Sequence, residues 1–243
     1  MSYTAFSSIY DKMILEDINY PFLCDFIENV FGLYGINPDI VLDIACGTGG
    51  VTGILADRGY DMIGIDKSYD MLNIALSKRD DILYLNQSFE NIDLFGTVGA
   101  AVCMTDGFCY ILSDKALVKA LTKLRTCFMD KGAVLIFDVS SDEKLKNIHG
   151  NSTYVYDGED IFYAWENKFY EKKKLSEMTI NFFKKGKKGY KRILERQILK
   201  VRTKEEIIRL LKMAGFSDIR VFSSTEFLEE EKPLRYYFTC QNL

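Results

Sequence analysis

The amino-acid sequence predicts an α/β fold in which a doubly wound, mostly parallel sheet of seven strands carries an antiparallel β insert. Short apolar runs alternate with helix-like segments between residues 39 and 139. From residue 151 to 200 the sequence is rich in aromatic and β-branched residues, which favour strands. Hydrophobic residues make up 48% of the 243 residues and only three residues are proline, so the chain can form a large core.

The alternating region is expected to supply five parallel strands and three helices. The predicted strands are residues 40–45, 62–65, 82–85, 100–104 and 133–139, and the predicted helices are 48–58, 69–78 and 114–128. Gly59 ends the first of these helices, and Ser68 is a suitable N-cap for the second. Strands that alternate with helices form a parallel sheet with helices on both faces.

The remainder of the chain is expected to form the insert and then return to the sheet. Four strands are predicted at residues 154–156, 161–170, 175–183 and 190–200, and we expect them to add antiparallel strands to the main sheet. Their lysine-rich turn is interpreted as a solvated hairpin tip and holds Lys184, Lys185, Lys187 and Lys188. A helix from Thr203 to Met213 and strands at 219–222 and 235–240 follow. The core would therefore comprise residues 1–150 and 201–243, and the insert residues 151–200.

Composition and charge argue against several functional classes. The net charge of −4 argues against a nucleic-acid-binding surface, which usually needs a basic face. The six cysteines form no C-x-x-C pair, so we expect no metal site and no redox dithiol, but reduced thiols in a core. The N-terminus lacks the apolar stretch of a signal peptide, and no apolar run has the length of a membrane span, so we expect a cytoplasmic protein without a membrane partner. Nothing in the sequence indicates the oligomeric state.

The most informative segment is the turn after the first strand, which holds Gly47 and Gly49. A glycine turn between a strand and a helix lets a ligand approach the backbone, and helix N–H groups there favour a carboxylate or phosphate. Asp66 ends the second strand about 20 residues later, where a carboxylate accepts hydrogen bonds from ribose hydroxyls. These features also fit a dinucleotide site, so a nicotinamide-dependent oxidoreductase is an alternative.

Two details favour a different ligand. The dinucleotide fingerprint has a third glycine three residues after the second, and that position is Thr52. A carboxylate inside the strand, at Asp43, would repel a pyrophosphate but suits a ligand that carries an ammonium and a sulfonium.

The segment Asp43–Gly49 (D-I-A-C-G-T-G) resembles the first motif of the class I S-adenosylmethionine-dependent methyltransferases, and Asp66–Leu72 resembles the second. The resemblance continues through Met104–Phe108 and the Lys131–Ala133 turn. It implies a Rossmann-like methyltransferase fold and S-adenosylmethionine as the cofactor. The opening tyrosines and the insert are similar to those of bacterial members with unassigned substrates, and the insert is similar in kind to those of glycine and nucleotide-sugar N-methyltransferases.

The resemblance also implies a set of cofactor contacts. Gly47 and Gly49 would line the methionine moiety, Asp43 would orient its amino group, and Asp66 would hold the ribose. Many members have an aspartate for the adenine amino group where this chain has Ser88, so either the Ser88 hydroxyl or the Gln87 amide substitutes or the adenine contact is weaker. The full expected set is Tyr20, Asp43, Ala45, Gly47, Thr48, Gly49, Asp66, Lys67, Met71, Gln87, Ser88, Phe89 and Thr105.

Methyl transfer from a sulfonium is an in-line displacement, in which the protein mainly aligns the donor with the methyl acceptor. A general base is needed only if the acceptor loses a proton. Asp106 and Tyr110, after the fourth strand, are the predicted catalytic residues. His149 is an alternative base, although its place in the sequence favours a surface-loop residue.

We expect the insert to cover the acceptor site. Alternate residues of one predicted strand share a face, namely Tyr163, Trp165, Asn167 and Phe169. Tyr163 and Trp165 would contact the acceptor together with Tyr10, although all three could equally serve packing. The chain lacks the N/D-P-P-Y/F motif of enzymes that methylate base amines, so we predict a small-molecule N or O acceptor, with RNA or protein as the alternative.

Overall fold

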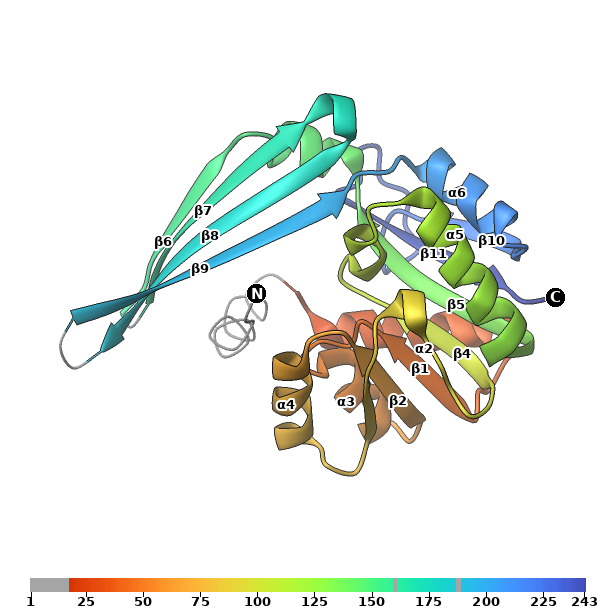
Figure 1. The fold of residues 1–243 in the computed structure, drawn as a ribbon. Helices are drawn as coiled ribbons and strands as arrows, with labels where there is room; N and C mark the ends of the chain where they lie inside the picture. The colour runs from red at the N-terminus through yellow and green to blue at the C-terminus, as the bar shows by residue number, and fades with distance from the viewer. Residues whose placement is uncertain (1–17, 160, 187–188) are drawn as a thin grey trace.

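The computed structural model describes residues 18–159, 161–186 and 189–243, and these form two sheets (Figure 1). The main sheet has seven strands in the order β10-β11-β5-β4-β1-β2-β3. Its strands are β1 (Ile40–Ile44), β2 (Asp61–Asp66), β3 (Leu83–Asn86), β4 (Val98–Cys103), β5 (Met129–Ser140), β10 (Ser217–Phe222) and β11 (Arg235–Gln241). Strands β1 to β5 pair in parallel, and β11 pairs antiparallel with both β5 and β10. The predicted fold class is therefore confirmed.

Four of the five α-helices in the described residues begin at a side-chain cap. They are α2 (Tyr20–Tyr34), α3 (Gly50–Asp57), α4 (Tyr69–Lys78), α5 (Asp114–Lys123) and α6 (Lys204–Met213). The Ser68 hydroxyl accepts the Met71 N–H at the start of α4, and Thr203 and Glu206 form a capping box at α6. The predicted helix 114–128 ends earlier because its last residues form a π-helical turn, Leu124–Phe128.

Side chains of the central strands alternate between two apolar cores. Val41 of β1, Val102 of β4 and Ile136 of β5 pack with α2 and α3. Their neighbours Leu42 and Phe137 pack on the other face, with α5 and α6. Because successive side chains of a strand point to opposite faces, both faces are covered by helices and the central strands are apolar throughout.

The insert corrects one prediction, because its strands form a separate sheet and do not extend the main one. The order is β6-β7-β8-β9, all antiparallel, and the strands are β6 (Thr153–Asp157), β7 (Ile161–Tyr170), β8 (Leu175–Gly186) and β9 (Gly189–Lys200). Residues Val134–Ser140 of β5 pair with β11, so this edge of β5 is not open to the insert strands. The insert strands therefore satisfy their backbone groups with one another.

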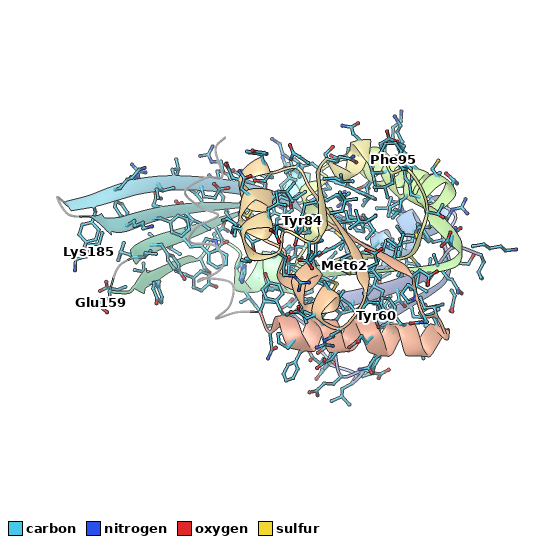
Figure 2. All side chains as sticks on the ribbon, turned by 90° about the horizontal axis from the view of Figure 1, so that it is seen from below. Tyr60, Met62, Tyr84, Phe95, Glu159 and Lys185 are labelled. Carbon is cyan, nitrogen blue, oxygen red and sulfur yellow. The ribbon has the colours of Figure 1, made fainter. Side chains whose placement is uncertain are left out.

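The insert sheet projects away from the core (Figure 1). Figure 2 shows Lys185 and Glu159 at its far end, so the lysine-rich turn lies at a distant tip, as the solvated-tip interpretation requires. Lys187 and Lys188 lie outside the described residues.

Five of the six cysteines are buried and the sixth, Cys127, is exposed on the π-helical turn, against the prediction of core thiols throughout. Burial raises the pKa of the Cys24 thiol to about 12, which keeps it protonated. None of the helices in the described residues is long and apolar enough to cross a membrane.

A buried ionic cluster joins the ends of β4, β5 and β11. Arg235 of β11 donates to Asp106, just after β4, over 2.9 Å between Nη2 and Oδ2, and also to the Asp138 carboxylate of β5. The Ser140 hydroxyl donates to Asp106 over 2.8 Å. Burial raises the pKa of Asp138, whereas at Asp106 the guanidinium and the Ser140 hydrogen bonds outweigh burial and lower the pKa. One cation thus serves two carboxyl groups.

Replacement of Arg235 by methionine should lower the free energy of unfolding by about 3–5 kcal/mol, because it leaves buried carboxylates unpaired. Urea denaturation at pH 7 measures this. Arg209→Met is the matched control, because that arginine is exposed and its loss should change stability by less than about 0.5 kcal/mol. Equal losses in both variants would contradict the structural role of the cluster.

Candidate active site

An open cavity of about 880 Å³ lies at the carboxyl ends of the central strands. It adjoins β1, whose neighbours in the sheet are β2 on one side and β4 on the other. This is the point where the strand order reverses, and ligands of doubly wound sheets bind there. Ten of the predicted site residues line it: Ala45, Gly47, Asp66, Lys67, Met71, Gln87, Ser88, Phe89, Thr105 and Tyr110.

The two glycines of the turn are required for different reasons. Gly47 has a φ of +56°, and a Cβ atom added there would meet no protein atom within 4 Å, so its backbone faces the cavity. Gly49 has a φ of +78°, and a Cβ atom there would lie 2.8 Å from the Tyr84 hydroxyl oxygen. Gly47 therefore leaves room for a ligand, whereas Gly49 leaves room for packing. Thr48 is buried between them, away from the cavity wall.

The Asp66 carboxylate ties the turn to the second strand. It accepts the Gly47 N–H over 2.9 Å and the Ser68 N–H over 2.7 Å, and it also lines the cavity. Burial raises its pKa above the usual value, although these two hydrogen bonds and Lys67 oppose the change. A carboxylate fixed in this way keeps free lone pairs for hydroxyl groups of a ligand.

Asp43 lies beneath the turn and not in the cavity wall. Its carboxylate accepts a hydrogen bond of 2.6 Å from the Thr52 hydroxyl. Burial raises its pKa to about 7, so a cation nearby would favour its charged form. The expectation that it orients the amino group of a ligand stays a prediction.

The loop after β3 distinguishes between the two expected adenine contacts. Both ends of the Gln87 amide are used inside the loop, because Nε2 donates to the Asp93 carbonyl over 3.0 Å and Oε1 accepts the Asp93 N–H over 2.9 Å. The Ser88 hydroxyl accepts only from Asn91, over 3.2 Å. Sequence reasoning missed Glu90, which lines the same cavity. Ser88 and Glu90 are therefore the better acceptors for an adenine amino group.

The segment after β4 forms the opposite wall. Thr105 and Asp106 have φ values of +61° and +68°, and the turn Gly107–Tyr110 follows them. The Asp106 carboxylate is held by Arg235 and Ser140 and its pKa is lowered, so it is a poor proton acceptor. The geometry therefore favours a positioning role for Asp106 over the predicted base.

Tyr110 joins the core to the insert. Its hydroxyl donates to Gln197 Oε1 over 2.7 Å, and Gln197, which comes from β9, also lines the cavity. The Lys67 ammonium lies 5.5 Å from the centre of the Tyr110 ring. Sequence reasoning missed Gln197, because it lies 87 residues from Tyr110 in the chain.

The other predicted residues that the structure describes lie outside the cavity wall. Tyr163 stacks on Tyr156 with 5.1 Å between ring centres, and the Trp165 ring lies 5.4 Å from the half-buried His149 ring, which is therefore not a surface-loop residue. Tyr20 packs on the glycine turn, where a Cβ atom on Gly50 would approach its ring to 2.8 Å. Tyr10 lies outside the described residues.

Comparisons with known proteins agree with this geometry. Residues 41–132 match the family model described as a methyltransferase domain. The Bacillus subtilis (strain 168) protein named "Putative methyltransferase YqeM" is 31% identical over 99% of this chain and 97% of its own length. A crystal structure of an S-adenosylmethionine-dependent methyltransferase from Clostridium acetobutylicum ATCC 824 is 28% identical, with a TM-score of 0.89 over 98% of both chains.

The insert also has a counterpart among solved structures. The sugar N-methyltransferase KedS8 from Streptoalloteichus sp ATCC 53650 has a TM-score of 0.79, covering 96% of this chain and 92% of its own, at 19% identity. At that identity the likeness shows a shared fold.

Asp66→Ala should weaken S-adenosylmethionine binding by about 1.5–3 kcal/mol, because hydrogen bonds to a charged acceptor contribute about that much. Isothermal titration calorimetry measures the change. The matched control is Asp61→Ala, which removes an exposed carboxylate from the other end of β2. Unchanged affinity in the Asp66 variant would show that the ribose is held elsewhere.

S-adenosylmethionine affinity should rise about eightfold between pH 6 and 7.5, because the cationic ligand needs the charged form of Asp43. The pKa of Asp43, raised by burial to about 7, means that binding below pH 7 requires loss of a proton. Calorimetry at both pH values measures the slope. The Asp43→Asn variant should bind more weakly with a flat profile, and a slope that persists in it would contradict the assignment.

Proposed function

Because the chain belongs to the class I S-adenosylmethionine-dependent methyltransferases, we propose that it transfers the methyl group to a nitrogen or oxygen atom of a small molecule. The observation that carries this proposal is the contribution of Gln197, from the insert, to the wall of the cofactor cavity. An insert that reaches this cavity leaves a compact space for an acceptor. Membership of this family also sets aside the nicotinamide alternative.

The cofactor half of the site fits its ligand chemically. Asp66 would hold the ribose, Met71 and Lys67 would pack on the adenine, and Ser88 or Glu90 would accept its amino group. Gly47 leaves the backbone open toward the methionine moiety. When bound, S-adenosylmethionine supplies an electrophilic methyl group and a neutral thioether leaving group.

The acceptor half would work by alignment. The Tyr110 hydroxyl and the Gln197 amide form one hydrogen-bonded pair at the cavity wall, so they can orient a polar group of the acceptor. Asp106 would act through the backbone of its turn, which it ties to Ser140 and Arg235. Alignment of this kind contributes several kcal/mol to a displacement reaction.

A small molecule is favoured over RNA by the charge distribution. The net charge is −4, and the lysine-rich turn lies at the far end of the insert (Figure 2). A polyanion would need basic groups beside the reaction site. The fold that this chain shares with a sugar N-methyltransferase is compatible with a small-molecule acceptor.

The test is an acceptor screen that follows release of S-adenosylhomocysteine. Small amines and alcohols are compared with total RNA and with a protein extract under identical conditions. Turnover of a small molecule supports the proposal. Turnover confined to RNA or protein would overturn the acceptor class, and failure to bind S-adenosylmethionine would overturn the function itself.

Tyr110→Phe should lower kcat about tenfold to a hundredfold, because it removes the hydroxyl that fixes Gln197 at the cavity wall. The Kd for S-adenosylmethionine should stay within about twofold, since the aromatic ring remains. Steady-state kinetics and calorimetry together measure both. Tyr190→Phe is the control, because Tyr190 is exposed near the far hairpin. A kcat equal to that of the control would remove Tyr110 from the reaction.

A further inference from the structure

One face of the insert sheet holds a group of buried polar side chains that cofactor binding does not use. We call it the inner face, because its residues Ile180 and Phe182 pack against Met71 of α4 in the core. Strand register places Trp165, Ile180 and Glu195 in one row across this face. Asn167, Met178 and Gln197 form the next row. Directly opposite residues of antiparallel strands point to the same side, so these rows share one surface.

The polar members of the inner face are almost completely buried. Asn167 is 2% exposed, Ser176 is fully buried and Glu195 is 6% exposed. Three polar atoms lack a hydrogen-bond partner among the described residues, namely Trp165 Nε1, Asn167 Oδ1 and Ser176 Oγ. A buried polar group without a partner is costly, and several on one surface indicate a place for a polar ligand.

Glu195 adds a negative charge to this surface. Its carboxylate hydrogen-bonds to the Gln197 side chain, and burial raises its pKa. Among the described residues no ion pair joins it to a lysine, arginine or histidine. A carboxylate with this degree of burial is normally paired with a cation.

The charged group is connected to the reaction site. Gln197 hydrogen-bonds to Glu195 on one side and accepts the Tyr110 hydroxyl over 2.7 Å on the other. Gln197 and Tyr110 both line the cofactor cavity. A molecule held on the inner face is therefore adjacent to the place where a methyl group would be offered.

We propose that Glu195, Asn167 and Trp165 form the binding site for the methyl acceptor, and that the acceptor is a small cationic amine with further hydrogen-bonding groups. This inference rests on the proposed function and deepens it. The ammonium would pair with Glu195, while the Trp165 N–H would donate to a ligand oxygen and Asn167 Oδ1 would accept from a ligand hydroxyl or amide. Neutral alcohols would leave the Glu195 carboxylate without a countercharge.

The charge balance of the reaction fits an amine. An ammonium first gives one proton to water, and its nitrogen lone pair then forms the bond to the methyl carbon while the carbon–sulfur bond breaks toward sulfur. The product is again an ammonium, now carrying the methyl group. Glu195 therefore faces a cation both before and after transfer.

The chain provides its own reporter for a binding test, because Trp165 is the one tryptophan in the sequence. Protein loaded with S-adenosylhomocysteine is titrated with small amines, each matched by the alcohol of the same skeleton: ethanolamine with ethylene glycol, putrescine with 1,4-butanediol, and glucosamine with glucose. Trp165 emission gives Kd, and S-adenosylhomocysteine release with fresh cofactor gives KM. At least one amine should shift the emission and be methylated, and its alcohol should do neither.

Glu195→Gln keeps the shape and removes the charge. It should raise Kd and KM for the amine at least tenfold and leave the Kd for S-adenosylmethionine within twofold. Its melting temperature should stay equal or rise, because a buried charge is removed. Glu166→Gln is the matched control, since Glu166 is exposed beside Trp165 and Asn167 on the same strand and points to the opposite face; it should change none of these values.

Three results would overturn the proposal. One is turnover of alcohols alone or of none of the amines, and another is equal amine affinity in the Glu195 and Glu166 variants. The third is a lower melting temperature with loss of both ligands in Glu195→Gln, which would make Glu195 structural. In the first two cases normal S-adenosylmethionine binding would leave the methyltransferase assignment standing, whereas its absence in the unaltered protein would overturn that assignment instead.

Discussion

The two-to-one pairing of Asp106 and Asp138 with Arg235 is the constraint on which the reaction side of the molecule depends. It connects β11, added antiparallel at the edge, to the loop that follows β4. That loop contains two non-glycine residues with positive φ, a backbone conformation that is unfavourable unless the surroundings hold it. This loop positions the part of the cavity wall from Thr105 to Tyr110. It thereby also positions the Tyr110 hydroxyl for its hydrogen bond to Gln197 of the insert.

The same cluster belongs to a wider accumulation of negative charge. Four buried or half-buried aspartates lie near the carboxyl ends of the central strands: Asp43, Asp66, Asp106 and Asp138. Arg235 pairs with two of them, and burial raises the pKa of the other two. A pyrophosphate would add charge of the same sign, whereas a sulfonium and an ammonium supply the missing positive charge. The electrostatics therefore favour the methyl donor over a dinucleotide, although the glycine turn by itself fits both.

The helix starts and the glycine turn could be predicted from the sequence, because their determinants are local. The helices α4 and α6 begin where Ser68 and Thr203 cap them, and the turn at Gly47 is set by residues within one strand–turn–helix unit. Ten of the expected site residues line one cavity, because parallel pairing brings the carboxyl ends of β1 to β4 to the same edge of the sheet. The sequence does not distinguish the roles of Gly47 and Gly49, because both have a positive φ. Only the structure shows that a Cβ atom on Gly49 would meet Tyr84, whereas one on Gly47 would point into open space.

The insert and its contact with the cavity depend on segments that are distant in the chain. The insert strands form a separate sheet, and β5 pairs instead with β11, which comes about a hundred residues later in the chain. In the sequence, Gln197 is one of several polar residues in a strand of alternating character. Its role becomes visible only in the structure, where β9 lies beside Tyr110.

The division between local and distant determinants has a functional consequence. Most residues that line the cavity lie between residues 44 and 111, in the part of the chain that holds the glycine turn and the ends of β1 to β4. The insert contacts the core through the Tyr110–Gln197 hydrogen bond, through packing on Met71 and through apolar residues such as Leu199. Under the proposed acceptor site, substitutions of the polar residues on its inner face would alter the acceptor surface, whereas the turn at Gly47 belongs to a different segment. Three buried polar atoms on this face lack a hydrogen-bond partner among the described residues, so under the proposed acceptor site their cost in stability would be incurred where selectivity for a second substrate is gained.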